Sequence, residues 1–84
     1  MQICETWSIT AERIRAFFLS QNEIRHERDD RFSYASCEIL LTPLPVRQVG
    51  CFLYPQTRVE FTGSDEDTEA IHRRFVLQFI SAGG

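Results

Sequence analysis

The 84-residue sequence contains no lysine, only four glycines, and no long apolar segment. A membrane-spanning helix needs about 18 consecutive apolar residues, so the sequence predicts none. Gly50 and Gly63 are too isolated to form a glycine-rich phosphate loop, and no serine lies in a Gly-x-Ser-x-Gly motif. These absences predict a protein that is not an enzyme and that uses no cofactor.

Cysteine is also scarce, since the chain has only Cys4, Cys37 and Cys51. An odd number without CxxC spacing argues against a secreted disulfide framework and against a zinc site. The N-terminal segment Met1–Thr10 carries Glu5 and no basic residue, unlike a secretory signal peptide. We therefore expect a cytoplasmic protein with reduced thiols and no bound metal.

All nine basic residues are arginines, and twelve acidic residues bring the net charge to −3. A net negative charge disfavours non-specific binding to nucleic acids and anionic membranes, so both are unlikely partners. The hydrophobic fraction of 43% is that of a soluble globular protein. The length predicts a single domain over residues 1–84.

Two amphipathic helices are predicted, one near each end of the chain. Thr10 is a suitable N-cap for a helix from Ala11 to about Gln21. Ser64, followed by three acidic residues, is a suitable N-cap for the last helix. Residues 75–80 alone are compatible with a strand, but the cap and the acidic cluster favour a helix.

Three apolar segments between these helices alternate as strands do: Phe32–Thr42, Val46–Tyr54 and Thr57–Thr62. The prolines at 43, 45 and 55 predict the breaks between them. We expect an α+β fold, a three-stranded antiparallel meander packed by two helices in the order α-β-β-β-α. Gln2–Trp7 is compatible with a short additional N-terminal strand. The polar segment 22–31 is compatible with a helix extension or a solvated loop.

The alternation also predicts register, because the odd-numbered positions of all three strands are the apolar, core-facing ones. Residues paired across two strands share a face, so odd positions must pair with odd positions. Only an odd-numbered loop achieves this, and we expect a three- or five-residue loop at Tyr54–Gln56.

If both helices cover the odd-numbered face, the other face carries exposed aromatic and aliphatic side chains. If one helix covers each face, none is left exposed. The first arrangement predicts protein–protein contact, as a homodimer or as an adaptor or inhibitor of a larger partner. The predicted interface residues are Tyr34, Leu40, Phe52, Tyr54, Arg58 and Leu77.

Two other functions stay open. The first is nucleic-acid binding by sheet aromatics together with Arg25, Arg28, Arg31 and Arg47. The second is a metal or catalytic site at a histidine. His26 lies in a mixed-charge segment typical of surfaces. His72 follows Glu69 by three residues, but the rest of a di-iron motif is missing, and we expect a core histidine bonded to backbone.

The sequence ends with Gly83 and Gly84, a pair that also ends sulfur-carrier proteins. In those proteins the pair follows a strand and the elements have a different order. The sequence therefore assigns the pair no role.

Overall fold

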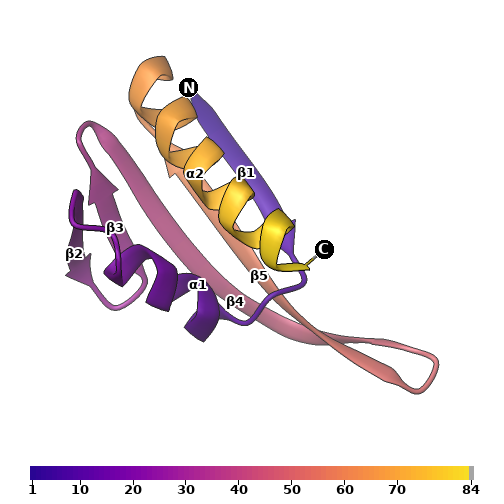
Figure 1. The fold of residues 1–84 in the computed structure, drawn as a ribbon. Helices are drawn as coiled ribbons and strands as arrows, with labels where there is room; N and C mark the ends of the chain where they lie inside the picture. Colours follow the sequence, from indigo (N-terminus) through magenta and orange to yellow (C-terminus); the bar gives the residue numbers. More distant parts are fainter. Residues whose placement is uncertain (84) are drawn as a thin grey trace.

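The computed structural model of the protein describes residues 1–83 (Figure 1). Its elements are β1 (Gln2–Trp7), α1 (Ala11–Leu19), β2 (Ile24–Arg28), β3 (Arg31–Tyr34), β4 (Cys37–Val49), β5 (Phe52–Thr62) and α2 (Asp65–Gly83). The strands form one five-stranded antiparallel sheet in the order β1-β5-β4-β3-β2. The predicted three-stranded meander is therefore wrong, although the α+β class is right.

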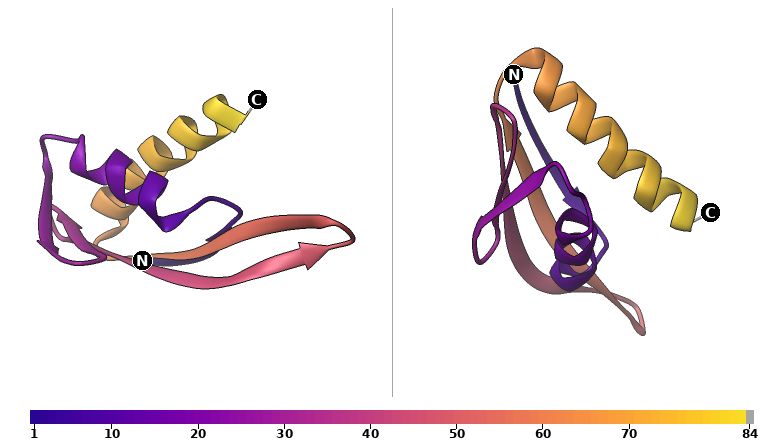
Figure 2. Two further views of the ribbon diagram at one scale, coloured as in Figure 1. Left: turned by 90° about the horizontal axis from the view of Figure 1, so that it is seen from below. Right: turned by 60° about the vertical axis from the view of Figure 1, so that its left-hand side comes forward.

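Both helices pack on the same face of the sheet (Figure 2). We call the opposite, uncovered face the outer face. An antiparallel sheet can leave one face in water when that face is mostly polar. The arrangement with one helix on each face does not occur.

The N-terminal half begins as the sequence predicts. The side chain of Thr10 accepts a hydrogen bond from the backbone N–H of Arg13 at 3.3 Å and caps α1. β1 is the short N-terminal strand, and its six residues pair with β5 from Gln2 opposite Thr62 to Trp7 opposite Thr57. It lies at one edge of the sheet.

The polar segment 22–31 is neither a helix extension nor a solvated loop, because it supplies β2 and the beginning of β3. Only Ile24 of β2 is half-buried, and the other residues are exposed. Such a strand can form at a sheet edge because its backbone hydrogen bonds to β3 hold it in place, although it has no apolar face to bury. Asp30 at the turn also accepts hydrogen bonds from the guanidinium of Arg15, which fixes this hairpin to α1.

The turn between β4 and β5 also differs from the prediction. Both proline-containing segments lie inside strands, and the turn is the two-residue loop Gly50–Cys51. Gly50 has a φ of 61°, which hairpin turns of this length require and which glycine adopts without strain. Pro43 and Pro45 do not end β4, because β3 reaches only Leu40 along it. Beyond that residue β4 has a free edge, where prolines are tolerated.

A β-bulge explains how a two-residue loop is compatible with odd-to-odd pairing near the core. Near the core Ile39 pairs with Phe61, so odd positions face odd positions as predicted. Between Leu44 and Arg47 the register shifts, since two residues of β4 lie opposite one residue of β5. Because of the extra residue, odd-numbered positions of β4 pair with even-numbered positions of β5 beyond the bulge. A loop with an even number of residues can therefore connect the two strands.

The core lies between the two helices and the inner face of the sheet. It is formed by Ile14, Phe18, Phe32, Cys37, Ile39, Leu41, Val59, Phe61, Ile71, Phe75 and Phe79. The rings of Phe18 and Phe75 stack at 5.8 Å between centroids and join the two helices. The inward positions predicted near the base of the two strands, Ile39, Leu41, Val59 and Phe61, are confirmed. Those predicted near the turn are wrong, because Val49 and Leu53 are exposed and Val49 pairs with Phe52 on the outer face.

The start of α2 is fixed to the turn between β3 and β4. Ser64 caps the helix, since its hydroxyl accepts from the N–H of Asp67 at 3.2 Å. The carboxylate of Asp67 accepts from both the hydroxyl and the N–H of Ser36, at 2.7 and 3.1 Å. The segment 75–80 is helical, as the cap predicted.

Candidate functional site

The β4–β5 hairpin projects well beyond the helices (Figures 1 and 2). We call its outer part, Val46–Tyr54, the arm. It forms because β1 pairs with β5 only as far as Thr57, while β3 pairs with β4 only as far as Leu40. Past these residues only the two strands of the arm pair with each other.

The arm is apolar although no helix covers it. Phe52 and Leu53 are 63% and 67% exposed, and Val46, Val49 and Tyr54 are exposed as well. These exposed side chains do not stabilise the arm by burial, because an isolated two-stranded ribbon has no core in which to bury them. An exposed apolar group of this kind on a small protein is a candidate contact surface.

The side chains of the arm fall on two faces. Val49 pairs with Phe52, and Arg47 pairs with Tyr54, so these four lie on the outer face. The rings of Phe52 and Tyr54 lie 6.4 Å apart between centroids. Leu53 pairs with Gln48 on the helix side. The outer face of the arm is thus the more aromatic of the two.

Prolines limit how the arm can bind. Pro43, Pro45 and Pro55 lie in or next to its strands, and proline has no N–H to donate to a further strand. Addition of a strand along the edge is therefore disfavoured. Contact through the faces of the arm is not restricted in this way.

The arm and its base carry only positive charge. Between Glu38 and Glu60 the sequence contains no acidic residue, and its two charged residues there are Arg47 and Arg58. Arg58 is exposed and, six residues from Phe52, lies on the outer face with it. A complementary surface would be apolar with acidic residues at one end.

The other predicted interface residues are divided between the two faces. Leu40 is half-buried on the outer face, opposite Glu60. The prediction that Tyr34 lies on the outer face is wrong. A two-residue turn at Ala35–Ser36 pairs Tyr34 with the buried Cys37, so its ring lies on the helix side, 5.3 Å from the guanidinium of Arg74.

Leu77 lies on α2 and is 60% exposed, as is Ile80. The exposed residues Glu66, Glu69, Arg73, Leu77 and Ile80 recur at helical spacing, and we call this stripe the α2 flank. Sequence reasoning singled out Leu77 but missed the rest. Their spacing of three and four residues was the signal that could have found them.

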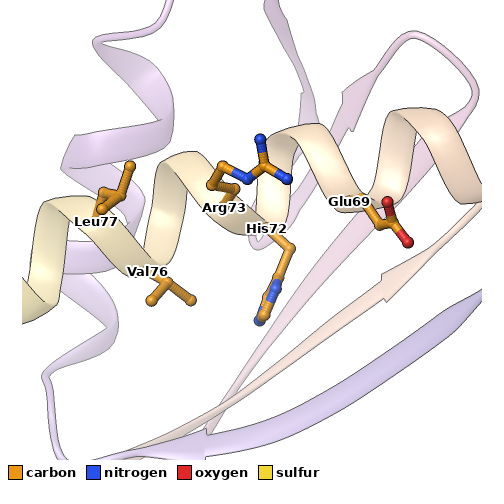
Figure 3. A pocket seen from close by; sticks show the side chains of 5 residues that line it. All are labelled: Glu69, His72, Arg73, Val76 and Leu77. Atoms are coloured by element: carbon orange, nitrogen blue, oxygen red, sulfur yellow. The ribbon is translucent and has the colours of Figure 1, made fainter.

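A shallow depression of about 320 Å³ adjoins the α2 flank and is lined by Glu69, His72, Arg73, Val76 and Leu77. Figure 3 shows Arg73 and Leu77 on one side of the helix and His72 and Val76 on the other. The depression is open and its residues come from one helix. It is therefore not an enclosed ligand site.

His72 bonds a carboxylate instead of the expected backbone group. Its Nε2 lies 2.9 Å from Oε1 of Glu5 on β1, and the same oxygen accepts from the indole N–H of Trp7 at 3.2 Å. The imidazole meets the ring of Phe61 edge-on at 5.4 Å. These contacts join α2 to the edge strand and give His72 a structural role.

His26 is exposed, stacks on Phe32 at 5.0 Å and bonds the carbonyl of Asp29 at 3.0 Å. Within residues 1–83 no group of three or more metal-ligating side chains comes together. Neither histidine therefore has the neighbours that a metal centre needs.

The arginines proposed for nucleic acid do not form one patch. Arg28 and Arg31 lie at the β2–β3 turn, while Arg47 lies in the arm. Arg31 pairs with Leu40, which is seven residues from Arg47 on β4, a separation of about 23 Å along the strand. Arg25 lies on the edge strand, opposite Ser33.

The two exposed cysteines are Cys4 and Cys51, and Cys37 is buried in the core. Burial raises the pKa of the Cys37 thiol, and hydrogen bonds from neighbouring groups oppose the shift only in part. No helix in the part of the chain that the structure describes meets the length and apolarity needed for a membrane span.

Comparison with known proteins gives one result at the level of the family. No curated protein matches the chain. A family model described as archaeal MoaD-like protein matches residues 3–84, which is nearly the whole sequence. The chain therefore belongs to the archaeal MoaD-like protein family.

Proposed function

We propose that this small protein is not an enzyme and that it acts in the cytoplasm by binding another protein through the arm. The observation that supports this most is the exposure of five large apolar side chains within nine residues of one projecting hairpin. A partner that covered these side chains would remove apolar surface from water, and this burial is favourable by about 25 cal/mol per Å². Packing in the hydrophobic core does not account for these five side chains, because they lie outside it.

The proposal is tested by replacing aromatic residues of the arm. Phe52→Ser together with Tyr54→Ser should abolish association, measured as mass by light scattering and as retention of partner proteins on immobilised chain. The melting temperature should change little, because both side chains lie outside the core.

Leu19→Ser is the matched control, since Leu19 is an exposed apolar residue of α1 outside the arm. This variant should associate like the wild type. Equal association by the arm variant and the wild type would refute the proposal.

The family supplies a second candidate function, a carrier protein loaded at a terminal glycine pair. The sequence contains Gly83–Gly84, and Gly84 lies outside the described residues. We propose it second because Gly83 is the last residue of α2, whereas in sulfur carriers the pair follows a strand. Mass spectrometry of the protein from its native cells should detect a covalent load on the peptide containing Gly84. Absence of any load would reject this candidate.

A further inference from the structure

The α2 flank has the properties that the arm requires of its partner. Its first part is acidic, with Glu66 and Glu69, and its last part is apolar, with Leu77 and Ile80. The outer face of β5 has the complementary order, since Phe52 and Tyr54 are followed by Arg58. An apolar end and a charged end thus occur on both surfaces, and the charges at Arg58 and Glu69 are opposite, with Glu60 half-buried beyond Arg58.

The spacings on the two surfaces agree. Tyr54 and Arg58 are four residues apart on a strand, which is about 13 Å. Leu77 and Glu69 are eight residues apart on a helix, which is about 12 Å. When the strand lies along the helix with Tyr54 on Leu77, Arg58 therefore reaches Glu69.

In this alignment Phe52 lies near Ile80, and Gln56 lies opposite Arg73. The aromatic residues then cover Leu77 and Ile80, which are both 60% exposed. Gln56 is neutral, so Arg73 meets no like charge there.

One chain cannot make this contact with itself. Phe52, Tyr54 and Arg58 lie on the outer face, whereas α2 lies on the opposite side of the sheet (Figure 2). The two surfaces can meet only between copies.

We propose that the occupant of the arm is a second copy of this chain, whose α2 flank packs against Phe52, Tyr54 and Arg58. This inference rests on the proposed function and adds the identity of the partner surface. Each copy carries both surfaces, so a twofold pair would make the contact twice.

Charge exchange tests the pairing. Arg58→Glu and Glu69→Arg each place like charges opposite one another, and each should raise the dissociation constant of self-association about tenfold or more. The double variant with both changes restores opposite charges and should recover most of the affinity. Mass by light scattering over a wide concentration range gives the constants, and thermal unfolding shows whether each variant is folded.

Glu12→Arg and Arg25→Glu are the matched controls, because they make the same charge changes at exposed residues of α1 and β2. Both should associate like the wild type. Loss of affinity in the single variants without recovery in the double variant would overturn the pairing.

Two further outcomes separate this inference from the proposed function. If Phe52→Ser abolishes self-association but Glu69→Arg has no effect, the arm binds a surface other than the α2 flank, and only the inference fails. If the wild type stays monomeric at all concentrations, the inference also fails, while partner retention still tests the arm. If neither self-association nor partner retention depends on the arm, both fail.

Discussion

Asp67 shows how one side chain can join two elements. It accepts hydrogen bonds from the hydroxyl and the N–H of Ser36, and these bonds lower its pKa from the ordinary value of 3.8. A lowered pKa in the folded state means that ionised Asp67 stabilises the fold above its unfolded pKa. That contribution is lost as the pH falls through the folded pKa.

We therefore expect Asp67→Asn to lower the melting temperature at neutral pH, with a gap to the wild type that narrows below pH 3.8. Thermal unfolding at a series of pH values measures this gap. Asp65→Asn is the control, because Asp65 makes no contact with Ser36 among the described residues. A gap that stays constant with pH would show that the carboxylate charge is not responsible.

Gly63 is a second residue with a specific steric role. A Cβ atom at this position would lie 2.6 Å from Cα of Cys37 and 2.7 Å from the carbonyl oxygen of Ser36. Both are backbone atoms, so they cannot rotate away. The close approach brings the N-terminus of α2 against the β3–β4 turn.

Gly63→Ala should lower the free energy of unfolding by about 1–3 kcal/mol, the range typical of overpacking. Urea denaturation measures it. At Gly50 an added Cβ would meet nothing within 4 Å, and only the positive φ opposes alanine there. The Gly63 variant should lose more stability than a Gly50→Ala variant. The reverse order would contradict the steric explanation.

At the scale of elements, α2 has a buried face and an exposed face. The inner face contributes Phe75, which is fully buried and contacts Trp7 edge-on at 5.0 Å and Phe18 in a stack. The α2 flank contributes Leu77, which is mostly exposed. The same helix therefore supports the fold and presents a surface.

Phe75→Ala should lower the free energy of unfolding by about 3–5 kcal/mol, because it leaves a cavity in the core. Leu77→Ser, two residues away, should change it by no more than about 0.5 kcal/mol. Chemical denaturation at a low protein concentration, where self-association is absent, compares the two. Similar losses would mean that the α2 flank is also part of the core.

At the scale of the whole molecule, the 42 Å length of the protein reflects an arm added to a small core. The helices cover the sheet on one face only (Figure 2), and the core between them and the sheet holds Cys37, while Cys4 and Cys51 lie outside it. The accessibility of the three thiols therefore reports on global unfolding.

In the native protein a thiol reagent should modify Cys4 and Cys51 rapidly. Cys37 should react only at the rate at which the molecule unfolds, since its thiol is buried and burial raises its pKa. Mass spectrometry over time counts the modified sites, and added urea should accelerate only the third. Rapid labelling of Cys37 in water would contradict a rigid core.

The sequence by itself determined the features that depend on neighbouring residues in the chain. Thr10 and Ser64 indicated where the two helices begin, and alternation identified the inward residues near the base of β4 and β5, although not those near the turn. These signals are local, since capping and side-chain periodicity act over a few residues. The exposed aromatics of the candidate site, Phe52 and Tyr54, were found in the same way.

Only the tertiary structure decided what depends on pairing between distant segments. The polar segment 22–31 forms β2 because β3 supplies its hydrogen bonds. Such an edge strand has no apolar pattern that would predict it from the sequence. The prolines did not end the strands because they lie on free edges, and the β-bulge between Leu44 and Arg47 reversed the parity that governed the loop prediction. The face that Tyr34 occupies follows from its pairing with Cys37 across the turn at Ala35–Ser36. That both helices share one face of the sheet is decided by packing between segments far apart in the chain (Figure 2).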